Sequence, residues 1–468
     1  MKDNFEDSGN TDDLKSSVQR FEEMLRKKDH YFFDVDAFLN IIDHYITKND
    51  PVRALQVVEY AKSQHPSSVS FFLKEAQLLS ITGQPFKAIE ILTNALRLDT
   101  SDPDIYMVRG SVYSQLGRYE DAISDFNMAI PLTEERDELY LNIAYTYVGW
   151  ENYESAIEYF KLSLIENPEN EIALYELAFC FDVTDKLEES IEFYLQYIDE
   201  QPYSFAAWYN LGIVYNKANL DEKALEAYDY AILIKYDFAS AHFNMANTLA
   251  NLGRYEDAIN SYKQTFEYEQ PDAVTYYNIG ECYEKLEQMD TARDFYKKAT
   301  KVNPFLAEGW FGIGITLDAE ERYYEAIHFV RKAIELDAEN PEFWYALADL
   351  EGKSGNIIIA EEAYKKVLDL EPDNEDIWLD FSAFLMEQNR NEEAIEMVAE
   401  GIKYHPQNAE IRYRLVFYLL ASGKKQEACI QLAEALELYY EEHIILYEYL
   451  PLLKNDKQIQ HLINSYRK

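Results

Sequence analysis

The chain has 468 residues, with 86 Asp or Glu against 43 Lys or Arg, so its formal net charge is −43. A field of this sign repels nucleic acid and anionic membranes and attracts basic partners. The three cysteines, Cys180, Cys282 and Cys429, lie far apart, which argues against a disulfide framework and fits a reducing compartment.

The amino terminus is acidic and polar. Residues 1–12 contain nothing to bury and are predicted to be disordered. Between residues 13 and 34, Leu14, Val18, Phe21 and Leu25 recur at helical spacing, which predicts a capping helix. No segment has the length and apolarity of a secretory signal or a membrane span. We therefore expect a cytoplasmic protein that does not insert into membranes directly.

A pattern of thirty-four residues begins at Val35 and repeats twelve times without a gap through Glu442. The units start at residues 35, 69, 103, 137, 171, 205, 239, 273, 307, 341, 375 and 409. The twentieth residue of each unit is alanine, except for Ser190, and the eighth is small in ten units. Position 4 is usually large and aromatic, as at Trp208 and Trp310. Each unit is predicted to form a helix over about positions 2 to 14, a turn that often contains glycine, and a second helix.

Residues 443–468 continue the pattern in degraded form. Leu446, Ile459, Leu462 and Tyr466 keep the apolar positions, whereas Pro451 interrupts the first helix of this thirteenth unit. Terminal units of a repeat array have a neighbour on one side only, so this segment is interpreted as a closing cap.

The repeat resembles the tetratricopeptide repeat family. The family pattern of Trp, Leu, Gly/Ala, Tyr, Ala, Tyr and Ala corresponds to Trp208, Leu211, Gly212, Tyr215, Ala224, Tyr228 and Ala231. Departures are local, with Glu75 and Arg109 where a leucine is usual. The resemblance implies an all-α, right-handed superhelix (an α-solenoid), in which positions 2, 5, 6, 9, 12 and 13 of each first helix face the concave groove.

Two rows of groove residues are candidates for binding a protein segment. Position 5 is apolar or aromatic throughout and includes Tyr175, Tyr209, Phe243, Tyr277, Phe311 and Tyr345. Position 6 carries amides at Asn142, Asn210, Asn244 and Asn278, with Asn247, Asn216 and Asn251 nearby. This row resembles the asparagine ladder of O-linked N-acetylglucosamine transferases, and amides can bond the backbone of an extended chain. Packing between helices is an alternative for the aromatic row, and inherited repeat consensus is one for the asparagines.

The distal groove is acidic. From the eighth unit onward its carboxylates outnumber its basic groups, and the candidates for attracting a basic segment are Glu281, Glu284, Asp318, Asp349 and Asp380. General acidity of the chain is the alternative explanation. Position 5 is never basic, so the carboxylate clamp that grips chaperone tails in this family is not expected.

The sequence favours a binding protein over an enzyme. The eight histidines are scattered, no nucleophile or metal-ligand spacing occurs, and no cofactor is expected. The leading hypothesis is a scaffold or adaptor that holds an extended or helical, basic or neutral segment of a protein partner in its groove. The alternative is a structural subunit of a larger complex, such as a secretion or envelope-biogenesis machine, that contacts its partners through the convex face or the ends.

Overall fold

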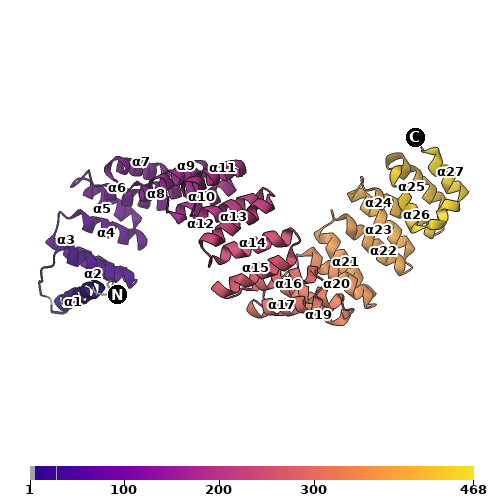
Figure 1. Cartoon of the computed structure of the whole chain (residues 1–468), viewed down its shortest axis with the longest axis horizontal. Helices are drawn as coiled ribbons and strands as arrows, with labels where there is room; N and C mark the ends of the chain where they lie inside the picture. The colour runs from indigo at the N-terminus through magenta and orange to yellow at the C-terminus, as the bar shows by residue number, and fades with distance from the viewer. Residues whose placement is uncertain (1–5, 28, 468) are drawn as a thin grey trace. The chain divides into compact units, whose positions relative to one another are not determined.

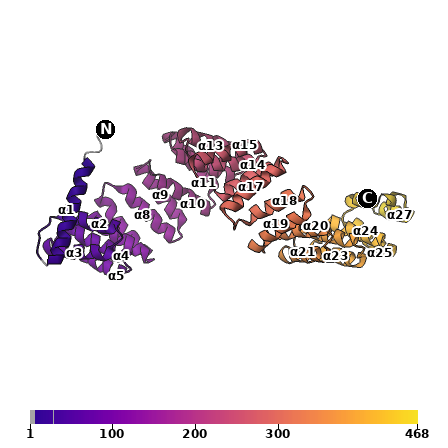
Figure 2. The same ribbon diagram turned by 90° about the horizontal axis from the view of Figure 1, so that it is seen from below.

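The protein is built from α-helices joined by short turns. This computed structural model describes residues 6–27 and 29–467, and no strand occurs within those ranges. The chain divides into two compact units, Met1–Tyr236 and Asp237–Lys468. Helices α1 to α13 belong to the first unit and α14 to α27 to the second. Within each unit, helix pairs follow one another in chain order (Figures 1 and 2).

The first helices begin at the first residue of each repeat unit, one residue before the predicted position 2, except that α8 begins one residue earlier still. They end about one residue before the predicted boundary. Their bounds are α2 (Val35–Thr47), α4 (Val69–Ile81), α6 (Pro103–Gln115), α8 (Arg136–Gly149), α10 (Glu171–Val183), α12 (Phe205–Lys217), α14 (Ala239–Asn251), α16 (Ala273–Lys285), α18 (Ala307–Asp318), α20 (Pro341–Lys353), α22 (Glu375–Glu387) and α24 (Ala409–Ala421).

The second helices pack against the first helices of their own repeats. Most span fourteen residues, and a 3₁₀ turn, η1 (Ile130–Leu132), continues α7. Their bounds are α3 (Pro51–Gln64), α5 (Pro85–Ala95), α7 (Tyr119–Ala129), α9 (Tyr153–Glu166), α11 (Leu187–Glu200), α13 (Asp221–Ile234), α15 (Tyr255–Tyr268), α17 (Met289–Val302), α19 (Tyr323–Leu336), α21 (Ile357–Leu370), α23 (Asn391–Tyr404) and α25 (Lys425–Leu438).

Position 15 of every repeat has a positive φ angle. Five repeats have glycine there, as predicted, including Gly83 at 78° and Gly117 at 70°. The other seven carry Asn, Asp or Glu, such as Glu287 at 58°. This residue in the left-handed conformation ends the first helix and reverses the chain. The backbone of any residue other than glycine is strained in that conformation.

The small residue at position 8 packs against position 24 of the second helix. A Cβ atom added to Gly212 would lie 2.5 Å from the ring of Tyr228, and one added to Gly280 would lie 2.6 Å from Tyr296. The aromatic residue at position 4 has another role: Trp208 donates from Nε1 to the Pro202 carbonyl at 3.0 Å, so this tryptophan closes the loop before its own helix.

The two departures from the family's leucine position form ion pairs. Arg109 donates from Nε to Asp125 Oδ2 at 2.6 Å and from Nη2 to Oδ1 at 2.7 Å, which joins α6 to α7. The Asp125 side chain is 8% exposed and that of Arg109 15%. Glu75 pairs with Lys62 of the preceding second helix. Charge pairing therefore replaces apolar packing at both positions.

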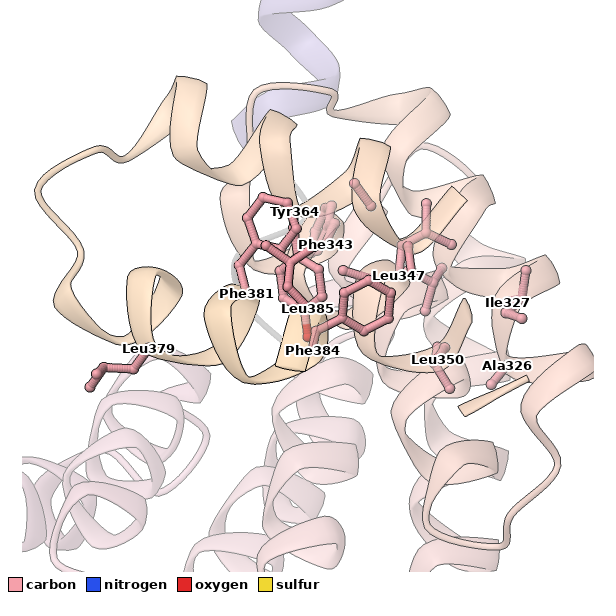
Figure 3. Close-up of a cluster of buried hydrophobic side chains, with 14 of the residues drawn as sticks. Ala326, Ile327, Phe343, Leu347, Leu350, Tyr364, Leu379, Phe381, Phe384 and Leu385 are labelled. Atoms are coloured by element: carbon pink, nitrogen blue, oxygen red, sulfur yellow. The ribbon is translucent and has the colours of Figure 1, made fainter. Parts of the chain in front are cut away.

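In the second unit, the core is continuous across several repeats. Tyr364 of α21 stacks on Phe381 of α22 with ring centroids 5.1 Å apart, and Phe384 lies beside both rings (Figure 3). Leu379, at position 5, lies apart from this aromatic group (Figure 3). Helix α22 therefore contributes Phe381 and Phe384 to the aromatic core and Leu379 to the row at position 5.

Helices outside the twelve repeats pack against both ends. In α1 (Glu6–Lys27), Phe21 and Met24 are buried, and Val18 and Leu25 pack against the same cluster. Residues 6–12 are helical, in contrast to the predicted disorder, because an established helix extends by one backbone hydrogen bond per residue. Residues 1–5 lie outside the described range.

The carboxyl-terminal cap is broken into short pieces. They are η2 (Glu441–Ile444), α26 (Ile445–Tyr449), η3 (Pro451–Asn455) and α27 (Lys457–Ser465). Leu446 and Ile459 are buried in one cluster with Tyr413 and Leu432 of the last repeat. Pro451 begins η3, so the predicted interruption lies at this proline.

Candidate groove site

A hollow of about 450 Å³ crosses three consecutive first helices, α4, α6 and α8. Its lining comes from groove positions 2, 5, 6, 9, 12 and 13, together with Val112 from position 10. We call it the α4–α8 pocket. It is lined by Leu73, Gln77, Ser80, Ile81, Asp104, Met107, Val108, Ser111, Val112, Gln115, Glu138 and Asn142.

The α4–α8 pocket combines an apolar surface with uncharged polar groups. Ser80 donates its hydroxyl hydrogen to Gln115, and Ser111 bonds the Met107 carbonyl of its own helix at 2.9 Å. Two carboxylates, Asp104 and Glu138, are exposed at its rim. Such a surface can hold both the side chains and the backbone of an extended peptide.

Asn142 is the one predicted ladder residue in the α4–α8 pocket. Its side chain is half-buried, and no described residue bonds its amide group. The preceding repeat has Phe126 at position 24, which has no hydroxyl to be satisfied. Both hydrogen-bonding sides of Asn142 are therefore available to a partner.

Asn210 occupies the same repeat position but serves the interior. It is 1% exposed and donates to the Leu174 carbonyl at 3.2 Å and to the Tyr194 hydroxyl at 3.3 Å. Tyr194 itself is fully buried. A buried hydroxyl and carbonyl need such partners, so the amide hydrogens of Asn210 hold α12 against the preceding repeat.

The other ladder residues are also occupied by internal bonds. Asn278 donates to Asn247 Oδ1 at 3.3 Å, and that oxygen also accepts from the Tyr262 hydroxyl at 2.5 Å. Asn216 donates to the Tyr228 hydroxyl at 3.0 Å. Asn244 is half-buried and also interacts with another group of the protein. Asn251 is exposed at the end of α14. Three of the seven asparagines, Asn210, Asn216 and Asn247, thus bond the hydroxyls of buried tyrosines.

Buried tyrosines, which were not predicted from the sequence, explain several of the asparagines. Tyr194, Tyr228, Tyr262 and Tyr296 all stand at position 24 of successive repeats and are almost completely buried. The signal was present, because position 6 becomes asparagine in the repeat that follows each of the first three. After Tyr296 that position is Gly312, where an added Cβ would lie 2.6 Å from the ring.

The aromatic row at position 5 packs on the same tyrosines. The Phe243 and Tyr262 ring centroids are 5.6 Å apart, as are those of Tyr277 and Tyr296. Tyr175 is 37% exposed, whereas Tyr209, Phe243, Tyr277, Phe311 and Tyr345 are half-buried. Each ring covers the core with one side, and Tyr175 offers the most surface to a partner.

The five predicted acidic residues of the second unit already have partners. Tyr277 donates to Glu281 at 2.9 Å and Tyr296 to Glu284 at 2.7 Å. Lys353 pairs with Asp318 at 3.1 Å and with Asp349 at 2.7 Å, and Tyr345 donates to Asp380. Lys353 pairs with only two of the five carboxylates, and the other three accept from neutral tyrosine hydroxyls, so this surface on α16 to α22 stays negative. We call it the acidic surface.

Burial and like charge act together on the acidic surface. Desolvation raises the pKa of Glu281, and the negative charge of Glu284 raises that pKa further. Desolvation and Glu281 also raise the pKa of Tyr277 far above its usual range. A cationic group brought close to these carboxylates would relieve the repulsion between them.

Two of the three cysteines, Cys180 and Cys282, are buried. Burial raises the pKa of Cys180 to about 12 and that of Cys282 to about 11, so both thiols stay protonated at neutral pH. Within the described residues, no group of three or more His, Cys, Asp or Glu side chains could hold a metal ion. None of the described helices is both long and apolar enough to cross a membrane.

The helix pairs and their repeated turn define an α-helical repeat protein. Residues 73–136 and 137–170 match models of the tetratricopeptide repeat, and residues 235–444 match the model of the cilia and flagella-associated protein 70 C-terminal domain. The chain is a tetratricopeptide repeat protein. No curated protein sequence matches it.

Solved structures of tetratricopeptide repeat proteins are similar to this chain. The C-terminal part of such a protein from Cytophaga hutchinsonii is 17% identical, with a TM-score of 0.44, over 52% of this chain and 99% of that chain. A chain of the APC/C hetero-tetramer Cut9-Hcn1 is 13% identical, with a TM-score of 0.41, over 90% of this chain and 94% of that chain. YrrB, described as having an unusual peptide-binding site, is 23% identical, with a TM-score of 0.33, over 39% of this chain and 93% of that chain.

Proposed function

We propose that this protein is a non-enzymatic scaffold that holds an extended segment of another protein against the groove side of its first helices. The α4–α8 pocket carries this proposal. Its volume of about 450 Å³ lies within the usual range for ligand sites, and its lining is drawn almost wholly from groove positions of three repeats.

The chemistry of the α4–α8 pocket suits a peptide backbone. The amides of Gln77 and Asn142 make no hydrogen bond to another described residue, and each offers a donor and an acceptor. Leu73, Met107 and Val108 supply apolar surface between them. A segment lying across α4, α6 and α8 would bond through its backbone and place alternate side chains on the apolar patches.

The acidic surface supports a basic or neutral segment in preference to an acidic one. Glu281 and Glu284 lie one turn apart on α16, and Lys353 forms ion pairs with only two of the five carboxylates, Asp318 and Asp349. Attraction of this kind is screened by salt over about 8 to 10 Å at physiological ionic strength. Binding at this surface should therefore weaken as salt is raised, whereas binding in the α4–α8 pocket should change little.

The test pairs affinity capture with crosslinking. The full chain is compared with a Gln77→Ala, Asn142→Ala variant. The control variant, Glu192→Ala, Glu200→Ala, changes two residues of α11, a second helix outside the groove row. The proposal expects crosslinks at α4 to α8 and a loss of capture of about tenfold in the first variant alone, with helicity unchanged. A tenfold loss corresponds to about 1.4 kcal/mol, the scale of one or two hydrogen bonds. Equal capture by all three proteins would refute groove binding.

A second candidate function is membership of a ciliary or flagellar complex. The observation that favours it is the match of residues 235–444 to a domain named for a cilia and flagella-associated protein. This proposal agrees with an assembly role in which the convex face or the ends meet other subunits. It would place the protein at the cilium rather than throughout the cytoplasm.

Localisation and fractionation test this second proposal. A tagged full chain, expressed in ciliated cells, should collect in the cilium and stay with the axoneme after detergent extraction. A uniform cytoplasmic signal would contradict it. Deletion of residues 237–468 should abolish targeting if the matched domain is responsible, whereas the double variant at Gln77 and Asn142 should still be targeted.

A further inference from the structure

Ser190 is the one exception to alanine at position 20 of the repeat. Its side chain lies at the contact between α11 and α10 and is 1% exposed. The hydroxyl oxygen has no hydrogen-bond partner among the described residues. A buried hydroxyl without a partner is costly, and alanine in the other units shows that the fold does not need it.

A cavity of about 100 Å³ lies beside this hydroxyl, between α10, α11 and α12. Phe181 and Val214 supply apolar walls, and Ser190 and Asn210 supply polar ones. One water requires about 10–15 Å³ of such space, so the cavity has room for several waters or for a small polar group.

Asn210 presents an acceptor to the same cavity. Both of its amide hydrogens are used, one for the Leu174 carbonyl and one for the Tyr194 hydroxyl. No described group donates to its Oδ1 atom. Those two bonds also fix the orientation of the amide, so the cavity has a fixed acceptor and a hydroxyl that can donate.

The cavity opens on the groove side of the first helices. Asp182 of α10 and Lys217 of α12 pair across its mouth, and both side chains are about half exposed. These residues stand at groove positions 12 and 13. A segment lying along the groove could therefore reach the cavity with one side chain.

We propose that this Ser190–Asn210 cavity receives the carboxamide of an Asn or Gln side chain from the bound segment. The carboxamide carbonyl accepts from the Ser190 hydroxyl, and its N–H group donates to Asn210 Oδ1. A hydroxyl side chain has one donor hydrogen and a smaller body, and a carboxylate has no hydrogen to donate to Asn210. The inference rests on the proposed groove function and adds a selectivity to it.

Selection from a library of random linear peptides tests the cavity. The full chain and its Ser190→Ala variant are each used to select binding peptides. Peptides selected by the wild-type chain should carry Asn or Gln at one fixed place, and replacing that residue with alanine should weaken binding about fivefold to tenfold, as expected for one or two hydrogen bonds. The Ser190→Ala variant should show neither the enrichment nor the loss.

Ser382→Ala is the matched control. Ser382 is also fully buried, but it bonds the Leu379 carbonyl at 2.7 Å and the Tyr418 hydroxyl at 3.1 Å. Its replacement should lower the unfolding midpoint and leave peptide selection unchanged. Ser190→Ala should keep or raise the midpoint, because it removes a hydroxyl without a partner. A lowered midpoint for Ser190→Ala would point to a structural serine and overturn the proposal.

The outcomes separate this cavity from the groove function. Selected peptides that depend on Gln77 and Asn142 but show no preference for Asn or Gln would refute the cavity alone. If no selected peptide depends on Gln77 and Asn142, the proposed groove function fails and the cavity proposal fails with it.

Discussion

The α4–α8 pocket and the acidic surface are built from the same repeat positions but differ in how their polar groups are used. In the pocket, the amides of Gln77 and Asn142 bond no described residue. On the acidic surface, tyrosines and Lys353 already occupy the carboxylates. Groove position alone therefore does not make a residue available to a partner, because neighbouring side chains can already occupy its hydrogen-bonding groups.

The largest expected effect comes from breaking the Arg109–Asp125 ion pair, which joins α6, a helix of the α4–α8 pocket, to α7. Asp125→Ala would leave the Arg109 guanidinium largely buried between α6 and α7 without its ion pair and its two hydrogen bonds to Asp125. Breaking a buried pair by removing one partner costs about 3 kcal/mol or more. Hydrogen exchange of the α6 and α7 amides should accelerate accordingly. The double variant Arg109→Leu, Asp125→Leu restores apolar packing and should recover most of the protection. Slow exchange in Asp125→Ala would mean that the pair does not hold this repeat together.

A smaller effect should separate the two asparagines. Asn210→Ala leaves the Leu174 carbonyl and the Tyr194 hydroxyl with fewer partners in a buried site, which costs about 2 kcal/mol. Asn142→Ala removes no internal bond and should change stability by less than about 0.5 kcal/mol. Urea unfolding followed by tyrosine fluorescence measures both. Equal destabilisation by the two variants would contradict the distinction between them.

The repeat could be predicted from the sequence because its period is imposed by local structure. Eleven of twelve first helices begin at the first residue of their repeat unit, within one residue of the predicted start, and position 15 reverses the chain in every unit. Which groove asparagines are already hydrogen-bonded within the protein could not be predicted by reading one repeat position at a time. Asn142 and Asn210 are equivalent by position, and only the identity of position 24 in the preceding repeat, Phe126 or Tyr194, separates them. Helical residues before residue 13 were missed because composition does not reveal how far a docked helix extends.

The turns offer a third contrast, of about 1 kcal/mol. In the repeats of α4 and α6, position 15 is Gly83 or Gly117, whereas in those of α16 and α18 it is Glu287 or Glu321. A left-handed residue with a Cβ atom costs about 1 kcal/mol relative to glycine. Gly83→Ala should therefore lower the unfolding midpoint and Glu287→Gly should raise it, as thermal unfolding can measure. Open space surrounds Gly83, so a clash cannot account for its loss. Shifts of the same sign in the two variants would show that backbone strain is not the controlling factor.

The smallest expected effect depends on pH. Because burial and Glu284 raise the pKa of Glu281 above its usual 4.5, the folded state binds that proton more tightly than the unfolded state. Stability contributed by this group is therefore present at low pH and lost as the pH rises through the folded pKa. Glu281→Gln removes that loss, so the variant should gain stability over the wild type as the pH is raised above 4.5.

Glu361 provides a control of opposite sign. Hydrogen bonds from Arg390 and Lys365 lower the pKa of Glu361 to about 2. Its stabilisation is present above the usual value of 4.5 and is lost as the pH falls toward 2. Glu361→Gln should therefore be less stable than the wild type at neutral pH, with the difference shrinking in acid. Thermal unfolding of both variants across the pH range should give differences that diverge as the pH rises. Parallel curves would show that the carboxylates of the acidic surface are as fully solvated as free ones, and that a basic segment would gain little from their mutual repulsion.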